Sequence, residues 1–267
     1  MRRPPPAMHA PAPRPPAQAR QGRAPAPRET GLWLHGLHPV AAALANPARR
    51  LRRLLLTTEA EATLAARVPQ PWRIAAERVE RNRFATFLPE DSVHQGAALL
   101  VEPLAEPTLE RVLAHDPGPI LVLDQVTDPR NVGAILRSAA AFGAAAILMQ
   151  NRHAPPETGA LARAASGALE LVPVVRIVNI ARGIEALKAA GCWVIGLDGA
   201  APVTLAQAAS DLAGRRPALV LGAEGEGMRR LTREHCDELA RLPIAAAMES
   251  LNVAAAAAVA LYELARR

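Results

Sequence analysis

The sequence has few of the residues that build disulfide frameworks, metal sites or membrane spans. Its two cysteines, Cys192 and Cys236, are not in Cys-x-x-Cys spacing, so neither a disulfide framework nor a zinc site is indicated. The seven histidines are scattered along the chain. No apolar run reaches the roughly 18 uncharged residues that a membrane span needs. We therefore expect a soluble protein with no metal and no membrane partner.

The sequence also has very little lysine, and it has no net charge outside its N-terminal residues. Lys188 is the only lysine, which compositional bias explains as well as a preference for arginine-phosphate contacts. The formal charge of +6 belongs to residues 1–28, which hold six arginines and no acid. The remainder is neutral, which argues against a nonspecific, strongly electrostatic nucleic-acid binder, although a local arginine patch can still hold phosphates.

Residues 1–30 are rich in Pro, Ala and Arg and contain almost no large apolar side chain, a composition that predicts a disordered tail. A basic, acid-free start is also found in organelle transit peptides, but the absence of serine and the many prolines favour a bacterial cytoplasmic protein.

The rest of the chain is predicted to be α/β, with three further segments. Residues 31–103 resemble a small α/β domain, 104–118 a proline-rich linker, and 119–267 a parallel-sheet domain with strands buried on both faces. In the first segment we expect helices at 38–46, 59–68 and 73–85 and strands at 51–57 and 97–101. In the last we expect strands at 120–124, 145–149, 171–175, 192–197 and 218–222, separated by helices that include 131–142, 158–166 and 180–190.

A first motif, Asp128 to Ala139, reads as a loop that enters a helix. Val132, Ile135, Leu136, Ala139 and Phe142 share one face of this helix, and Gly143 ends it. Arg137 lies off the apolar face. A purely structural interpretation makes Asn131 the N-cap and Arg137 a solvated surface residue.

A second motif, Leu221 to Met228, follows an apolar strand with the sequence Leu-Gly-Ala-Glu-Gly-Glu-Gly-Met. Its glycines allow positive φ angles and a close backbone approach. The motif is neither Gly-x-Gly-x-x-Gly nor a P-loop, and it places two acids where a phosphate would rest. Such a loop suits a cationic or amine-bearing ligand better than a pyrophosphate.

Two more motifs lie close behind. They are Leu-Pro-Ile, Leu242 to Ile244, and Glu-Ser-Leu-Asn-Val-Ala, Glu249 to Ala254, which opens an alanine-rich helix. On a structural interpretation Ser250 caps this helix, and Leu251, Ala255, Ala258 and Leu261 pack inward.

In this order and spacing, the four motifs resemble those of the SpoU-type RNA ribose 2′-O-methyltransferases of the SPOUT superfamily. His35 to Leu44 and His94 to Gly96 resemble the branch that methylates guanosine in 23S ribosomal RNA. The resemblance covers residues 31–267. It implies an RNA-binding domain like ribosomal protein L30e at 31–103, a trefoil knot in the C-terminal domain, and a homodimer.

The resemblance also implies a cofactor and a set of site residues. The cofactor is S-adenosylmethionine (SAM), whose methyl is attacked by a ribose 2′-hydroxyl. The matching catalytic positions are Asn131, Arg137, Glu224, Ser250 and Asn252. Gly222, Leu242 and Leu251 match positions that contact SAM, mainly through backbone atoms. Because arginine has a high pKa, we expect Arg137 to anchor a phosphate and orient the hydroxyl rather than act as a general base.

Three other functions remain open. Methylation of transfer RNA is the alternative within the same enzyme class. A noncatalytic RNA-binding or ribosome-assembly protein has no need for all five polar site residues. A dinucleotide-dependent oxidoreductase is disfavoured because Gly-x-Gly-x-x-Gly is missing.

Overall fold

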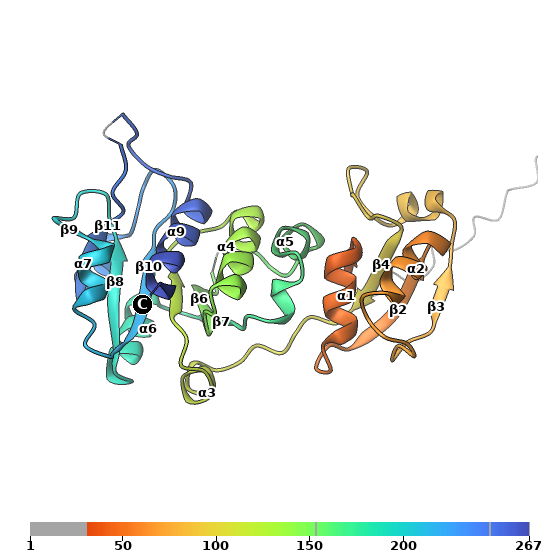
Figure 1. Cartoon of the computed structure of the whole chain (residues 1–267), viewed down its shortest axis with the longest axis horizontal. Helices are drawn as coiled ribbons and strands as arrows, with labels where there is room; N and C mark the ends of the chain where they lie inside the picture. Colours follow the sequence, from red (N-terminus) through yellow and green to blue (C-terminus); the bar gives the residue numbers. More distant parts are fainter. Residues whose placement is uncertain (1–30, 153, 246, 267) are drawn as a thin grey trace, which may run out of the picture. The chain divides into compact units, whose positions relative to one another are not determined.

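Two β-sheets organise the residues that the computed structural model describes, which are 31–152, 154–245 and 247–266. The predicted disordered tail, 1–30, lies outside them. The first sheet has four strands in the order β1-β4-β2-β3, and the second has seven in the order β7-β6-β5-β10-β8-β11-β9. We call residues 31–101 the N-terminal lobe and residues 118–266 the C-terminal lobe; Figure 1 labels most of their elements.

The N-terminal lobe contains a mixed sheet whose central strands are the most apolar. Strand β4 pairs antiparallel with β1 and β2, and β2 pairs in parallel with β3. All five side chains of β4 are buried, because its alternate residues face apolar clusters on opposite sides of the sheet, Leu99 in one and Ala98 in the other. The elements are β1 (Leu32–His35), α1 (Leu37–Ala45), β2 (Leu51–Leu56), α2 (Thr58–Ala65), β3 (Ala76–Arg78), the 3-10 helix η1 (Arg81–Thr86) and β4 (Ala97–Val101).

The helix predicted at 73–85 is wrong. Residues Ala76–Arg78 form the edge strand β3 instead, and a short 3-10 helix, Arg81–Thr86, follows. The local sequence has helical spacing, but parallel pairing with Leu54 to Leu56 outweighs this weak preference. Phe84, which is fully buried, then packs on Leu55 and Ala98 on one face of the sheet. The other predicted elements of this lobe lie within a few residues of their expected positions.

The predicted parallel sheet of the C-terminal lobe is confirmed, since every strand pair in it is parallel. Its elements are β5 (Ile120–Leu123), α4 (Pro129–Ala141), β6 (Ala146–Gln150), α5 (Gly159–Ala165), the 3-10 helix η2 (Ala168–Glu170), β7 (Val174–Ile177), α6 (Ile180–Ala189), β8 (Cys192–Leu197), β9 (Val203–Thr204), α7 (Leu205–Ser210), β10 (Arg216–Leu221), α8 (Arg230–His235), β11 (Glu238–Arg241) and α9 (Val253–Ala265).

Alternating side chains divide this sheet between two layers of helices. Leu121 and Leu123 of β5 join the core under α4, α5, α7 and α9, whereas Ile120 and Val122 join the core under α6. Helices α4 and α9 lie side by side on the first face (Figure 1). This arrangement places the beginnings of both helices near the carboxyl ends of the central strands.

Two details differ from the predicted organisation. The strand expected at 171–175 begins only at Val174, because 168–170 form η2 and Leu171 is exposed. The segment 104–118 contains a helix, α3 (Leu109–His115), capped by Thr108, whose hydroxyl accepts from the Arg111 N–H at 3.3 Å. The trefoil knot stays a prediction, because strand order and pairing do not define how the chain passes through its loops.

Candidate active site

Helix α4 presents the first motif at the carboxyl edge of β5. Asp128 is its N-cap and accepts from the Arg130 N–H at 2.8 Å, with Pro129 in the first turn. The structural interpretation, in which Asn131 is the N-cap, is therefore wrong. Because a true cap already serves the helix, the Asn131 side chain is left to make contacts elsewhere. Val132, Ile135, Leu136 and Ala139 are buried as predicted.

The loop after β10 folds tightly on itself. Ala223 and Gly227 exchange backbone hydrogen bonds, and Gly225 and Gly227 have φ angles of 79° and 69°, which glycine adopts without strain. A Cβ on Gly222 would lie 2.1 Å from the backbone carbon of Gly227. Glycine is therefore required at 222 for close approach, and the loop carries Glu224 outward as an exposed side chain.

Helix α9 begins two residues later than predicted. Asn252, not Ser250, is its N-cap, and its Oδ1 accepts from the N–H groups of Ala254 at 3.0 Å and Ala255 at 3.3 Å. This start changes the buried face. Leu261 is buried as predicted, but Val253, Ala257 and Ala260 are buried in place of Leu251, Ala255 and Ala258.

Three side chains from these segments meet in one polar network. Asn131 Nδ2 donates to Glu224 Oε1 at 3.0 Å, and Asn252 Nδ2 donates to Asn131 Oδ1 at 3.1 Å and also to Glu224 Oε1. The Val253 N–H adds a bond to Glu224 Oε1 at 3.3 Å. We call Asn131, Glu224 and Asn252 the exposed network. The fold thus joins three of the five predicted catalytic residues, from three separate motifs.

Comparisons with known proteins agree with this geometry. The family model described as "SpoU rRNA Methylase family" matches residues 118–262, which include the whole exposed network. A second model, described as "RNA 2'-O ribose methyltransferase substrate binding", matches residues 33–107. The chain belongs to the SpoU rRNA methylase family. The resemblance noted from the motifs is confirmed, and so is the enzyme class that it implies.

Two curated relatives extend the match over most of the chain. The 23S rRNA (guanosine-2'-O-)-methyltransferase RlmB of Pseudomonas syringae is 40% identical, with 88% of this chain and 95% of the relative covered. RlmB of Vibrio cholerae is also 40% identical, covering 88% and 96%. The solved structure of the SpoU methyltransferase AviRb from Streptomyces viridochromogenes, in complex with the cofactor AdoMet, has a TM-score of 0.70 and 25% identity, and the match covers 88% of this chain and 89% of AviRb.

The remaining predicted catalytic residues lie outside the exposed network. Arg137 is exposed on α4 and has no hydrogen-bond or ion-pair partner among the described residues. It follows Asn131 by six positions, so the two side chains leave the helix in different directions. Ser250 is exposed in the loop before α9, also without a polar partner in the described part of the chain. Within one chain, the structure does not bring either residue to Glu224.

The three positions predicted to hold the cofactor would contact it mainly through backbone atoms, and we call them the backbone sites. Gly222 lies under the folded loop, Leu242 is half-buried, and Leu251 is 37% exposed. Among the described residues, the main-chain groups of Leu242 and Leu251 have no hydrogen-bond partner. These groups are therefore available to a ligand.

Sequence reasoning missed a buried ion pair that fastens the loop. Asp124 is 0% exposed, and its carboxylate accepts from Arg229 through the backbone N–H at 2.9 Å, Nε at 2.8 Å and Nη2 at 2.7 Å. Asp124 directly follows β5 and Arg229 directly follows the glycine-rich loop, so the pair closes the loop against the sheet. An acid at the end of an otherwise apolar strand was the available signal.

A cavity of about 420 Å³ opens beside the loop, at the carboxyl ends of β5 and β6. Its polar lining includes Gln125, Thr127, Gln150, Arg152 and Glu226. Gly222, Leu242 and Leu251 do not line it. The residues predicted to hold the cofactor therefore do not belong to this cavity.

Metal and thiol chemistry find no support in the described residues. No cluster of His, Cys, Asp and Glu suited to a metal ion occurs among them. Burial raises the pKa of the Cys236 thiol to about 12, and burial also raises the pKa of Cys192, so both are inert thiols near neutral pH. None of the helices in the described part of the chain is long and apolar enough to cross a membrane.

Proposed function

We propose that this chain transfers a methyl group from SAM to a ribose 2′-hydroxyl of RNA, with a guanosine of 23S ribosomal RNA as the target. The observation that carries the proposal is the exposed network, in which Asn131, Glu224 and Asn252 meet beside the loop of Gly222. The names of the relatives from Pseudomonas syringae and Vibrio cholerae support the target.

The backbone sites fit SAM. Unpartnered main-chain groups at Leu242 and Leu251 suit the edge of an adenine ring, which needs both donors and acceptors. Tight folding at Gly222 leaves no side chain to obstruct a close approach. When bound, SAM supplies an electrophilic methyl on a good leaving group. Gly222, Leu242 and Leu251 are the residues that would hold it.

The protein's part in the reaction is positioning and charge. The exposed guanidinium of Arg137 suits the phosphate of the target nucleotide, because it can bind two oxygens at once. Asn131, oriented by Glu224 and Asn252, would hold the ribose so that its hydroxyl faces the methyl. Ser250 would help order the pocket on the side of α9. The hydroxyl proton would leave as the bond forms and pass to solvent water, because a phosphodiester held by a guanidinium is too weak a base to keep it.

We further propose that the active protein is a homodimer in the bacterial cytoplasm. Five exposed large apolar side chains lie on α9 and the loop before it: Ile244, Met248, Leu251, Val259 and Tyr262. A second copy of the chain packed there would cover this surface. Such a dimer could also bring the unpartnered Arg137 of one subunit to the exposed network of the other. The bacterial sources of the relatives support the location.

Light scattering in moderate salt tests the dimer. We expect about twice the chain mass of 28.2 kDa. Tyr262→Glu should shift the protein toward monomer and reduce activity, because it places a charge in the apolar surface. A monomeric protein that remains fully active would contradict the proposal.

The target is tested by mapping 2′-O-methyl groups by mass spectrometry in ribosomal and transfer RNA from a strain that lacks the gene. We expect one guanosine of 23S RNA to lose its methyl group and to regain it when purified protein and SAM are added. Loss from a transfer RNA instead would replace the target but keep the chemistry. Unchanged methylation in both RNAs, together with no SAM binding by calorimetry, would refute the proposal.

A further inference from the structure

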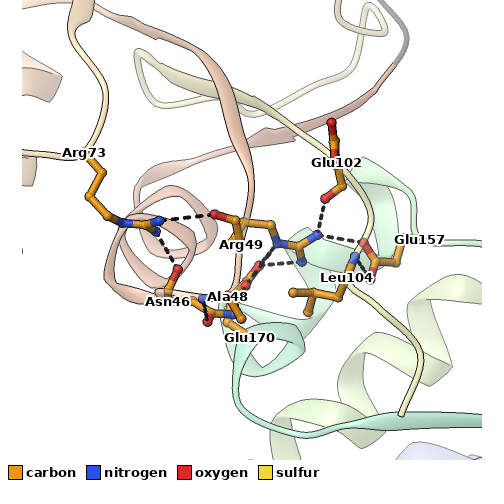
Figure 2. Close-up of polar contacts among 8 residues, drawn as sticks. All are labelled: Asn46, Ala48, Arg49, Arg73, Glu102, Leu104, Glu157 and Glu170. Carbon is orange, nitrogen blue, oxygen red and sulfur yellow. Dashed lines mark hydrogen bonds and ion pairs between the residues drawn. The ribbon is translucent and has the colours of Figure 1, made fainter.

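One buried arginine connects the two lobes. Arg49 lies in the loop between α1 and β2, and its side chain is 0% exposed. It donates to Glu170 through Nε at 3.0 and 3.1 Å and through Nη2 at 2.6 Å. Its Nη1 donates to Glu157 at 3.0 Å and to the backbone oxygen of Glu102 at 2.9 Å. Figure 2 shows the guanidinium lying between these acceptors.

The acceptors come from the C-terminal lobe and from the segment that joins the lobes. Glu157 directly precedes Thr158, the N-cap of α5, and Glu170 ends η2. Glu157 also accepts from the Leu104 N–H at 3.4 Å, and Glu170 accepts from Asn46 Nδ2 at 2.7 Å. The N-terminal lobe, the connecting segment and the C-terminal lobe therefore meet at one guanidinium. We call Arg49, Glu157 and Glu170 the buried network.

The loop that carries Arg49 is held firmly on its own lobe. Arg73 donates to the backbone oxygens of Asn46 and, at 3.3 Å, Arg49 (Figure 2). Asn46 Oδ1 accepts from the Ala48 N–H at 2.9 Å. Because the loop is held on the N-terminal lobe in this way, Arg49 cannot change its direction unless the whole lobe turns with it.

Close packing of the N-terminal lobe against α5 and the turn after it extends the contact between the lobes. A Cβ on Gly159 would lie 3.0 Å from His35 Nε2, and one on Gly167 would lie 2.9 Å from Ala42 Cβ. On its other side α5 packs against α4, where a Cβ on Gly133 would lie 2.5 Å from Ala164 Cβ. Helix α5 therefore stands between the N-terminal lobe and the helix that carries Asn131 and Arg137.

Stability alone gives no reason for a charged cluster here. Apolar side chains of similar volume often stabilise a protein as well as a buried ion pair does, because desolvating the charges is costly. A guanidinium that binds one carboxylate through two nitrogens and a second through another is directional, which an apolar contact is not. Lobes joined by a short segment are expected to move unless a large apolar contact holds them. Here apolar side chains of α1 and α5 share one core cluster, and the ion pair adds a directional contact beside it.

We propose that Arg49 is a positioning residue: through Glu157 and Glu170 it fixes the orientation of the N-terminal lobe, so that RNA bound there reaches the α4 helix in register. The inference rests on the proposed function for the role of RNA. The fixed orientation itself does not depend on that function and is measured separately.

Arg49→Met tests the proposal, because methionine keeps much of the length and removes the donors. Spin labels on Ala62→Cys and Ala186→Cys, both exposed positions in α2 and α6, report the distance between the lobes in a background in which the half-buried Cys236 is replaced by alanine. We expect a narrow distance distribution in the parent protein and a broad one with Arg49→Met. The KM for RNA should rise about tenfold, while SAM affinity and kcat at saturating RNA stay within about twofold.

Arg50→Met is the matched control. Arg50 is the next residue, but its side chain is 80% exposed and its one ion pair, with Glu102, measures 3.5 Å. We expect the control to keep the parent's distance distribution and KM. Arg49→Lys should fall between the parent and Arg49→Met, since an ammonium keeps the charge but cannot bind Glu170 through two nitrogens.

A second variant covers the case in which Arg49→Met does not fold. In that protein the carboxylate of Glu170, whose side chain is 3% exposed, is buried without its cation. Arg49→Met combined with Glu170→Gln removes this cost, so folding should return while the broad distribution and the high KM remain. A folded variant of either kind with a narrow distribution, or with an unchanged KM for RNA, would overturn the proposal.

The two proposals fail in different ways. If the parent protein methylates RNA and Arg49→Met leaves both measurements unchanged, only the positioning role is refuted. If the parent protein methylates no RNA, the proposed function is refuted, and the distance distribution alone decides whether Arg49 holds the lobes together.

Discussion

Glu170 of the buried network and Glu224 of the exposed network are carboxylates of the same lobe with opposite surroundings. Glu170 is enclosed and binds the guanidinium of Arg49. Glu224 is exposed and is held by two side-chain amides and the Val253 N–H, with no cation against it among the described residues. Neutral donors orient a carboxylate without cancelling its charge, whereas a guanidinium does both.

This difference in surroundings distinguishes a structural contact from a ligand-binding site. In the buried network the polar groups use most of their hydrogen-bonding capacity within the protein. In the exposed network a negative charge and an oriented amide remain available to a ligand. Hydrogen-bonded groups with unused capacity at the carboxyl edge of a parallel sheet are where ligands bind in such folds.

The largest expected effect comes from removing the guanidinium of Arg137. Arg137→Ala removes an exposed group and raises helix propensity, so folding and SAM binding should stay normal. Methyl transfer should fall by roughly two orders of magnitude or more, the scale of a lost transition-state contact. Arg137→Lys should rescue poorly if two-nitrogen contact with a phosphate matters. Wild-type transfer rates for Arg137→Ala at saturating RNA and SAM would refute the role.

The buried pair next to the exposed network tests whether its loop needs an anchor. Asp124→Asn keeps the shape of the side chain but removes the charge that holds Arg229. We expect a loss of about 2 kcal/mol in the free energy of unfolding, measured with urea, and weaker SAM binding. The matched control is Arg230→Gln, which breaks an exposed pair with Glu234 and should cost less than about 0.5 kcal/mol. Equal losses in the two variants would contradict the anchoring role.

Asn252 allows its two contacts to be separated. Asn252→Ser keeps a good N-cap for α9 but loses the amide that donates to Asn131 and Glu224. Methyl transfer should fall about tenfold while thermal stability is nearly unchanged. Asn252→Ala should show the same loss of activity and lose about 1 kcal/mol of stability as well. If Asn252→Ser is fully active, the network serves only to cap the helix.

The smallest effect is expected from a change of pH, which alters stability through His35, a residue at the same contact between the lobes as the buried network. His35 is 6% exposed where the N-terminal lobe meets α5. Burial lowers its pKa from the ordinary 6.5, and the nearby charges of Arg163 and His94 act in the same direction. Because the unfolded chain then binds a proton more readily, stability is complete above pH 6.5 and decreases as the pH falls below it.

The measurement is the thermal midpoint between pH 7 and about pH 5. His35→Gln, which cannot titrate, should flatten part of the decrease. His94, whose pKa burial also lowers, should account for a remaining part. An identical pH profile in the parent and in His35→Gln would show that His35 contributes nothing.

Local patterns were enough to predict much of the fold. Apolar runs between helical stretches indicated the parallel sheet, and the buried face of α4 followed from its spacing. The candidate site came from the family resemblance instead: Asn131, Glu224 and Asn252, which it placed in one catalytic centre, do meet. The catalytic and cofactor-binding roles of all eight predicted site residues remain predictions.

Where local signals were weak or conflicting, sequence reasoning failed. Residues 73–85 have helical spacing, but Ala76–Arg78 form an edge strand because β2 offers a free edge for pairing, and a 3-10 helix follows. Helix α3 was missed among prolines because its seven residues are too few for a clear period. The structural interpretation placed the caps of α4 and α9 on the wrong residues, since several polar residues stand near each helix start and only the folded backbone selects one.

By itself, the sequence determined the elements with strong periodicity, the parallel sheet and the motifs that gather at its carboxyl edge, because these depend on neighbours along the chain. Only the tertiary structure decided that Arg49 meets Glu157 and Glu170, and that Asp124 meets Arg229. Such pairs join residues that are distant in sequence, and a charged residue carries no local mark of its partner. The fold supplies the burial that makes their pairing necessary.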